Sequence, residues 1–208
     1  MILPYQHKEA VPRALHILQN GGVFVYPTDT LYGFGADAGS GSGIRLIGKL
    51  KKRPSRTPFS LLVRDLTMMK DYARVSGLVA AIAGRFLPGA LTLVLPGNAG
   101  ALPDELYSEG QFLGFRISAH PFCRELTAKY PKPVLSTSVN ISGKDALNRI
   151  EDIQAQFGRQ LTLMIEDAEL DRRQQARGST VIRIDANDSI SLLREGSISF
   201  TEILKVKP

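Results

Sequence analysis

The sequence has little cysteine, no tryptophan and no long apolar run. The only cysteine, Cys123, excludes an internal disulfide and a zinc site built on paired cysteines. No apolar run approaches the roughly 18 residues that a membrane-spanning helix needs. The N-terminal MILPYQHKEA carries an acid and a proline where a signal peptide is apolar. We therefore expect a cytoplasmic protein without membrane association and without a metal site built from its own side chains.

Acidic residues are outnumbered by basic ones, with 20 Asp and Glu against 26 Lys and Arg in 208 residues, a formal net charge of +6. This excess favours an anionic partner, such as a nucleotide, a nucleic acid or a phosphorylated metabolite. Aromatic residues make up only 7% of the chain, which makes a base-stacking platform less attractive. Hydrophobic content of 43% is that of an ordinary globular protein.

Helical and extended patterns alternate along the chain, with no repeat and no long linker. Helices are expected at 11–20, 42–51, 77–86, 121–129, 150–157 and 200–206. Strands are expected at 23–26, 58–63, 91–95, 112–117, 134–139, 161–165, 180–184 and 190–193. The sequence thus predicts one α/β (α+β) domain over residues 1–208, with a twisted mixed parallel and antiparallel sheet of about seven strands flanked by helices.

One stretch matches the start of a nucleotide phosphate loop. GIRLIGK at 43–49 has the required glycines and lysine, but Leu50 stands where a serine or threonine must bind Mg²⁺. Its apolar residues suit a helix, so we interpret it as helical.

A polar cluster directly follows the first apolar strand. PTDTLYGFG at 27–35 places Thr28, Thr30 and Tyr32 at the carboxyl end of that strand, where open sheets bind ligands. A simple turn capped by Asp and Thr explains the same residues. Both interpretations stay open at this point.

Two cations close the second predicted helix. In KKRP at 51–54, Lys51 and Arg53 lie two positions apart, so an extended exit segment would point both to one side and grip an anion. The alternative is ordinary capping of a helix C-terminus by positive charge.

The segment LSTSVNISG at 135–143 is the most informative. In a strand, Ser136, Ser138 and Asn140 share one face and Leu135 and Val139 the other. Such short polar side chains suit hydrogen bonding to a ligand, although an exposed sheet face remains the alternative.

Arg116 lies inside an apolar strand, and Arg194 ends another. A guanidinium near a core needs a carboxylate or phosphate, which the ligand or the chain itself can supply. Ser179 opens a further strand and adds a hydroxyl. Cations and hydroxyls without an evident acid–base pair suit phosphoryl or nucleotidyl transfer.

Seven ordered blocks together resemble the YrdC-like family of threonylcarbamoyl-adenylate synthases, over about residues 11–203. The blocks are PTDTLYGFG, KKRP, PGALTLVLP, GFRISAHP, STSVNISG, GSTVIRI and LLREGSIS. The resemblance implies a YrdC-like fold with a concave basic cavity. It also implies an ATP-dependent nucleotidyltransferase that joins L-threonine and bicarbonate to AMP with release of pyrophosphate. The product would serve threonylcarbamoyladenosine modification of tRNA position 37, with partner proteins and possible RNA binding.

The resemblance also implies roles for individual residues. Lys51 and Arg53 would face the phosphates as catalytic residues. Mg²⁺ would arrive with ATP as the one cofactor. The binding residues would be Thr28, Thr30, Tyr32, Thr57, Arg116, Ser136, Ser138, Asn140, Ser179 and Arg194, with Thr28, Arg116 and Ser179 at the threonine end.

Two positions depart from the family pattern. Thr57 and Leu62 stand where many members carry an asparagine and a histidine, and the nearby PFSLLVRDL is closer to the YciO-type branch. This leaves two alternatives open: an RNA- or nucleotide-binding paralogue, and an enzyme that uses a different amino acid.

Overall fold

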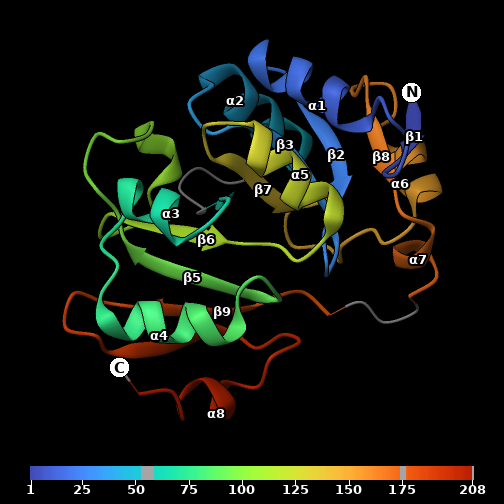
Figure 1. Cartoon of the computed structure of the whole chain (residues 1–208). Coiled ribbons are helices and arrows are strands. Elements are labelled where there is room, and N and C mark those ends of the chain that lie inside the picture. Colours follow the sequence, from blue (N-terminus) through green and yellow to red (C-terminus); the bar gives the residue numbers. More distant parts are fainter. Residues whose placement is uncertain (53–58, 174–176, 208) are drawn as a thin grey trace.

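The computed structural model describes residues 1–52, 59–173 and 177–207 (Figure 1). One sheet of ten strands runs through this part of the chain, in the order β1-β8-β2-β3-β7-β4-β6-β5-β9-β10. Its strands are β1 (Ile2–Pro4), β2 (Phe24–Pro27), β3 (Tyr32–Asp37), β4 (Ser60–Leu62), β5 (Leu91–Pro96), β6 (Phe112–Arg116), β7 (Val134–Ser138), β8 (Met164–Glu166), β9 (Thr180–Ile184) and β10 (Ile190–Arg194). Parallel pairs such as β4–β6 alternate with antiparallel pairs such as β3–β7, which confirms the mixed sheet.

The described helices flank this sheet. They are α1 (Ala10–Gln19), α2 (Gly41–Leu50), α3 (Leu66–Tyr72), α4 (Gly77–Phe86), α5 (Pro121–Lys129), α6 (Ile150–Phe157), α7 (Ala168–Asp171) and α8 (Phe200–Ile203), with a 3₁₀ helix at Asp104–Leu106. The glycine-rich 43–49 stretch lies in α2, as expected, and the Ser40 side chain caps that helix at the backbone N–H of Gly43. No helix of the described residues is long and apolar enough to cross a membrane.

The expected number of strands was too low, because the sequence analysis did not predict β1 and β3. β3 carries glycines at 33 and 35, which ordinarily weaken a strand. Here the rings of Phe24 and Tyr26 pack over it, and a Cβ on Gly35 would lie 2.9 Å from carbons of both rings. The glycine that disfavours the strand locally is therefore what allows its neighbour to pack.

The two faces of the sheet differ in character. One face buries residues such as Phe34, Leu61 and Phe115 against α2, α3, α4 and α6, forming the main core. At the β2 end of the other face, Phe24 and Tyr26 form a second core with α1 and α5. Towards β5 and β9 that second face carries short or polar side chains instead, and there the candidate site lies.

Gly35 and Gly48 provide a test of this packing. We expect Gly35→Ala to lower the free energy of unfolding by about 1–3 kcal/mol, because the new methyl group overlaps two buried rings. Gly48→Ala is the control, since nothing lies within 4 Å of its Cβ position in α2, and it should be neutral or stabilising. Urea denaturation measures both, and equal effects of the two changes would contradict the packing argument.

Candidate functional site

A cavity of about 760 Å³ lies over the polar part of the sheet. Ten of the twelve candidate residues line it: Thr28, Thr30, Tyr32, Lys51, Arg116, Ser136, Ser138, Asn140, Ser179 and Arg194. The other two, Arg53 and Thr57, lie outside the described residues. An adjoining hollow of about 730 Å³ shares Ser138, Asn140 and Arg194 with this cavity. Residues from six separate blocks of the sequence thus meet in one place.

The floor of the cavity is made of small side chains on neighbouring strands. Ser136 on β7 pairs with Ser60 on β4, and Ser60 pairs with Gly114 on β6. The hydroxyl of Tyr26 donates to Ser136 Oγ at 2.7 Å and fixes that side chain. Leu135 is buried in the main core, as its alternation with Ser136 predicted. The polar face of this strand is therefore turned to the cavity.

Lys51 holds the end of β7 in place. Its Nζ donates to the carbonyl oxygen of Ser138 and to Oδ1 of Asn140, both at 2.6 Å, and the residue is only 3% exposed. Ser138 Oγ also donates to Asn140 Oδ1 at 2.8 Å. The ammonium group thus orients both residues of the S-x-N pair while it adds positive charge to the cavity wall.

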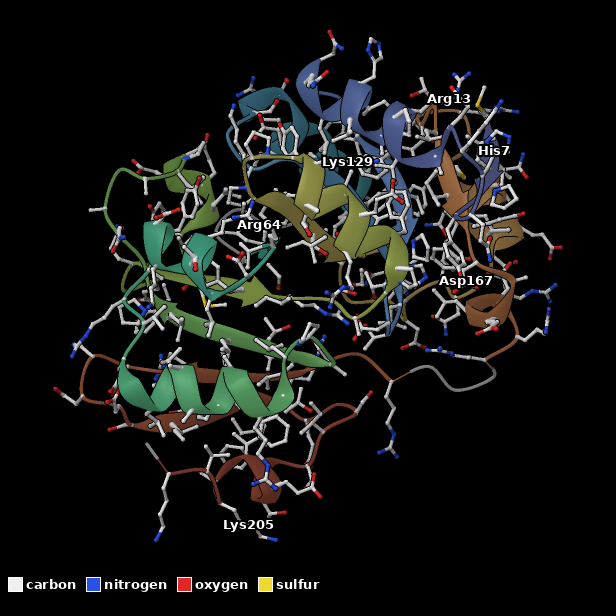
Figure 2. The ribbon with its side chains drawn as sticks, in the orientation of Figure 1. His7, Arg13, Arg64, Lys129, Asp167 and Lys205 are labelled. Carbon is white, nitrogen blue, oxygen red and sulfur yellow. The ribbon has the colours of Figure 1, made fainter. Side chains whose placement is uncertain are left out.

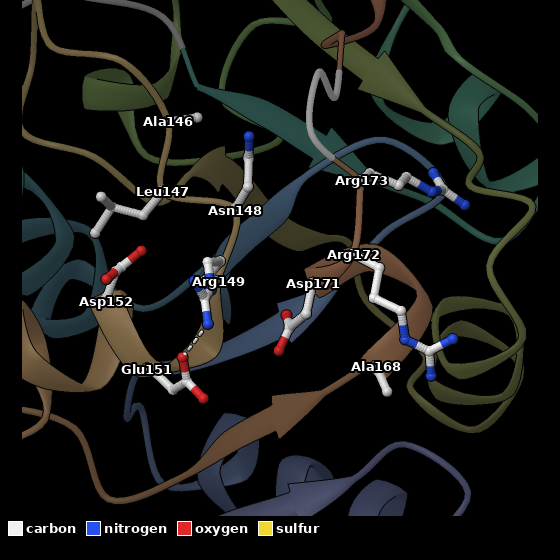
Figure 3. Close-up of a pocket in the computed structure, with 10 residues that line it drawn as sticks. All are labelled: Ala146, Leu147, Asn148, Arg149, Glu151, Asp152, Ala168, Asp171, Arg172 and Arg173. Atoms are coloured by element: carbon white, nitrogen blue, oxygen red, sulfur yellow. Dashed lines mark hydrogen bonds and ion pairs between the residues drawn. The ribbon is translucent and has the colours of Figure 1, made fainter.

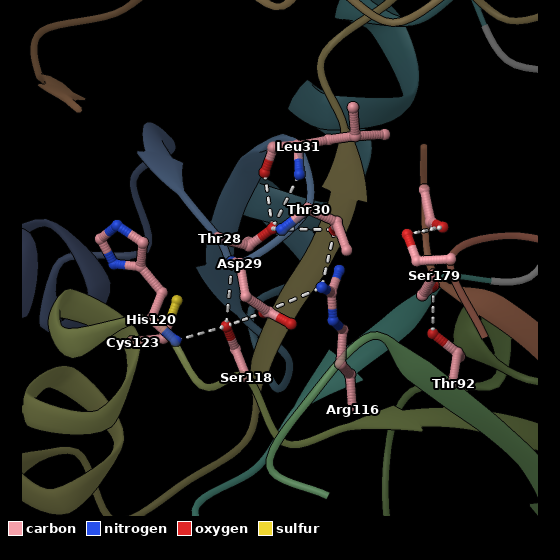
Figure 4. Close-up of polar contacts among 12 residues, drawn as sticks. Thr28, Asp29, Thr30, Leu31, Thr92, Arg116, Ser118, His120, Cys123 and Ser179 are labelled. Carbon is pink, nitrogen blue, oxygen red and sulfur yellow. Dashed lines mark hydrogen bonds and ion pairs between the residues drawn. The ribbon is translucent and has the colours of Figure 1, made fainter. Parts of the chain in front are cut away.

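Thr28 organises the turn that follows β2 (Figure 4). Its Oγ1 donates to the carbonyl oxygen of Leu31 at 2.6 Å and accepts the backbone N–H groups of Thr30 and Leu31, each at 3.1 Å. The turn interpretation of this segment is therefore confirmed, and the same turn lines the cavity.

Arg116 reaches this turn from β6 (Figure 4). Its Nη2 donates to Asp29 Oδ1 at 2.9 Å and to Thr30 Oγ1 at 2.6 Å, and Ser118 Oγ donates to the same carboxylate oxygen. The chain itself thus supplies a carboxylate partner. Arg116 Nε is buried and has no hydrogen-bond partner among the described residues. Nη1 also has no hydrogen-bond partner among the described residues, and it is not one of the fully buried unpartnered atoms, so it is the donor of this cation that a ligand can reach.

The sequence analysis missed Asp29. A carboxylate between two candidate hydroxyls, directly after a strand, was the signal for it. Its role depends on Arg116, which lies 87 positions away and meets it only in the folded chain.

Arg194 and Ser179 form another wall. Arg194 Nη2 donates to the carbonyl oxygen of Ser179 at 2.9 Å, and Ser179 Oγ shares a hydrogen bond with Thr92 at 2.8 Å. Within the described part of the chain, Arg194 contacts no carboxylate. Partial burial, and then the positive charge of Arg116, lower the pKa of Arg194. Two guanidinium groups therefore act on one cavity, which favours an anionic ligand.

Tyr32 borders the cavity, but its side chain forms hydrogen bonds with α7 and the residue before it. The ring is fully buried, and its hydroxyl donates to Asp171 Oδ1 at 2.6 Å and accepts the backbone N–H of Asp167 at 2.9 Å. Burial, and then the bond to Asp171, raise the pKa of this hydroxyl. Tyr32 thus anchors α7 to the sheet.

Leu62 occupies the position of the family histidine. It pairs with Arg116 across β4 and β6, is 1% exposed, and belongs to the second core with Tyr26. The side of Arg116 next to β4 is therefore apolar.

A separate hollow of about 660 Å³ lies between α6 and α7 (Figure 3). It contains none of the candidate residues. Its charges are mixed, because three arginines and three acidic residues line it, and Arg149 pairs with Glu151 at 2.6 Å. It does not share the net positive character of the sheet cavity.

Lys51 is expected to matter for stability as well as for binding. Lys51→Ala should lower the free energy of unfolding by about 1–3 kcal/mol, because it leaves the partly buried oxygens of Ser138 and Asn140 without their charged donor. The control is Lys132→Ala. The side chain of Lys132 is 59% exposed, and its Nζ makes a long, solvent-screened ion pair of 3.5 Å with Asp37 Oδ2, so this change should lower the free energy of unfolding by less than about 0.5 kcal/mol. Chemical denaturation checks both, and an unchanged stability for Lys51→Ala would contradict the positioning role.

The chain is similar to proteins of one known family. The Sua5/YciO/YrdC family model, described as "Telomere recombination", matches residues 16–196. A putative threonylcarbamoyl-AMP synthase of Methanocaldococcus jannaschii is 32% identical over 186 residues, covering 89% of this chain and 85% of that protein. A threonylcarbamoyl-AMP synthase of Yersinia enterocolitica is 30% identical over 162 residues, covering 76% and 85%.

Solved structures of Sua5 and YciO proteins are also similar to this chain. P. abyssi Sua5 complexed with L-threonine has a TM-score of 0.88 and 26% identity, covering 99% of this chain. The chain spans only 60% of the length of that Sua5 chain. E. coli YciO has a TM-score of 0.84 and 26% identity, covering 96% of this chain and 95% of YciO.

Proposed function

The chain belongs to the Sua5/YciO/YrdC family, and we propose that it is a threonylcarbamoyl-AMP synthase. It would join L-threonine, bicarbonate and ATP into threonylcarbamoyl-AMP and release pyrophosphate. The observation that carries the proposal is the cavity whose lining brings together five of the candidate residues: Lys51, Arg116, Ser138, Asn140 and Arg194. The names of the curated relatives support the same reaction.

Threonine would bind at the Arg116 end of the cavity. The unpartnered Nη1 of Arg116 suits a carboxylate, and the nearby hydroxyls of Thr30 and Ser179 line the same cavity. Asp29 would hold the guanidinium in place and offset its charge before substrate arrives. The Sua5 relative, solved with L-threonine, supports an amino-acid site in this fold.

The nucleotide would lie along Ser138, Asn140 and Arg194. Hydroxyl and amide groups at the end of β7 suit the ribose and phosphates, and Arg194 supplies a charge-assisted donor. Lys51 holds this strand end, and Arg53 would add a further cation. These groups are short or rigidly held, as positioning of a phosphate chain requires.

The chemistry would need positioning and charge more than proton transfer. Threonine's amine would attack the carbon of CO₂ and lose a proton to water, or attack bicarbonate, whose C–OH bond breaks as a water molecule leaves; either route gives a carbamate. The carbamate oxygen would then attack the α-phosphorus in line, forming one O–P bond as the bond to pyrophosphate breaks. Lys51, Arg194 and Arg53 would stabilise the charge that moves onto the leaving group. The enzyme would thus be a nucleotidyltransferase.

Mg²⁺ would accompany ATP. No cluster of three or more His, Cys, Asp or Glu side chains that could hold a metal exists among the described residues. Lys51 Nζ already donates to the carbonyl oxygen of Ser138 and to Asn140 Oδ1, so the hydroxyl oxygen of Ser138 is the group of this pair that would contact an ion held mainly by phosphates and water, as Mg²⁺ commonly is. Bound there, the ion would offset phosphate charge.

His120 is a buried histidine with a structural role. Its Nδ1 accepts the N–H of Phe122 at 3.1 Å, and its Nε2 lies 3.2 Å from Asp167 Oδ2. Burial lowers the pKa of this imidazole. The ring therefore serves as a neutral structural link, and the proposal gives it no proton to carry.

The product would be passed on for modification of tRNA position 37. The reaction leaves threonylcarbamoyl-AMP, so partner proteins would have to transfer the group to adenosine in the cytoplasm. This step rests on the family and on the names of the relatives.

Pyrophosphate release tests the proposed reaction. With ATP and bicarbonate, release should depend on L-threonine, and Arg116→Ala should lower kcat/KM for threonine by about 10–100-fold through loss of a charge-assisted contact. Arg13→Ala is the matched control, because Arg13 projects from α1 and its side chain is 48% exposed (Figure 2). Release that is equal with serine and threonine would instead indicate a different amino-acid substrate.

A YciO-type RNA-binding role is the second candidate. It is favoured by the near-complete match to E. coli YciO and by Leu62 at the histidine position. In this case the basic cavity would bind RNA phosphates and no ATP-dependent product would form.

Salt dependence separates these two functions. We expect ATP affinity to change by less than about tenfold between 50 and 200 mM salt, because the ligand contacts a partly enclosed site. RNA binding through six or more phosphates would weaken by about 10³-fold over the same range. Isothermal titration with ATP and with tRNA measures both. Tight, steeply salt-dependent tRNA binding without ATP binding would overturn the synthase proposal.

A further inference from the structure

A row of small residues leads across the cavity floor to an arginine that no step above uses. Ser136, Ser60 and Gly114 lie side by side on β7, β4 and β6. The row continues through Val94 on β5 to Arg183 on β9. All five residues line the cavity. Because strand neighbours in register project to the same face, the row forms a shallow trough that ends at the guanidinium group.

The guanidinium of Arg183 is held in place without being neutralised. Its Cζ lies 5.3 Å from the centroid of the Phe112 ring, so the side chain is stacked and has lost part of its rotamer freedom. No ion pair or hydrogen bond of this side chain is present among the described residues, and the residue is exposed. Its planar fork of donors is therefore available to an anion.

The other described cations of this cavity already donate hydrogen bonds to groups of the chain. Lys51 donates to Ser138 and Asn140, and Arg116 donates to Asp29. Arg194 donates to the carbonyl oxygen of Ser179. At the β9 end, Arg183 is the described cation whose donors are not used by the chain.

We propose that Arg183 forms an oligophosphate subsite at the β9 end of the cavity, which binds the terminal phosphates of ATP and then the released pyrophosphate. The identity of this ligand rests on the proposed function. The planar guanidinium of Arg183 would bind two oxygens of a phosphate group at once, which the ammonium group of a lysine cannot do with the same geometry. Glu109 lines the same end of the cavity, and its charge opposes tight retention of pyrophosphate, as product release requires.

The test compares Arg183→Ala with Arg85→Ala by calorimetry, with pyrophosphate, ATP and AMP as separate probes. Arg85 stacks on Phe86 at 5.6 Å in α4 but does not line the cavity, so it controls for loss of a stacked arginine. We expect Arg183→Ala to weaken pyrophosphate and ATP binding by about tenfold and to leave AMP binding unchanged. Arg183→Lys should recover part of the loss, and Arg85→Ala should change none of the three affinities.

If the unsubstituted protein binds ATP, two results would overturn the Arg183 subsite and leave the proposed function intact. One is an unchanged pyrophosphate affinity in Arg183→Ala. The other is an equal loss of AMP affinity, which would place Arg183 at the nucleoside or α-phosphate end. A chain that binds neither ATP nor pyrophosphate in any form would overturn the proposed function together with this subsite. Thermal melts of both variants confirm that each is folded.

Discussion

The central strand β7 must satisfy two environments at once, and the site depends on how it does so. Leu135 is buried in the main core, while Ser136 and Ser138 on the opposite face line the cavity. A slip of one residue in register would exchange these faces and place hydroxyls in the core. The antiparallel pairs of β7 with both β3 and β4 prevent that slip. The same pairing brings Ser60 and Gly33 into the cavity.

Charge is arranged around this strand in a consistent way. Each buried or half-buried cation is bound by oxygen atoms of the chain, as Lys51 is by Ser138 and Asn140, and Arg116 is by Asp29. Burial of an unpaired cation would be costly, so these contacts make a positively charged cavity tolerable without ligand. They also leave selected donors, notably Arg116 Nη1, for a substrate. Preorganisation of this kind suits a reaction that proceeds by alignment and charge stabilisation.

The small side chains have an equally specific effect. Gly35 allows the rings of Phe24 and Tyr26 to pack on β3, and Gly114 keeps the floor of the cavity low. The apolar end of the face is thereby closed by α1 and α5, and the remaining part stays accessible to a ligand. The same sheet face is thus covered by helices at one end and forms a cavity at the other, and the size of the side chains along its strands determines which of the two occurs.

The sequence by itself determined the periodic elements and the chemistry of the candidate residues. Strong signals, such as the helical patterns of 77–86 and 121–129 and the alternation in 134–139, depend on near neighbours, and the structure confirms them as α4, α5 and β7. Only the tertiary structure decided what depends on distant partners. β3 is a strand because aromatic rings on β2 cover its glycines, Arg116 finds Asp29 across 87 positions, and Tyr32 turns to α7. Local patterns specify which groups a segment offers, whereas the partner that each group meets is set by sheet register and packing.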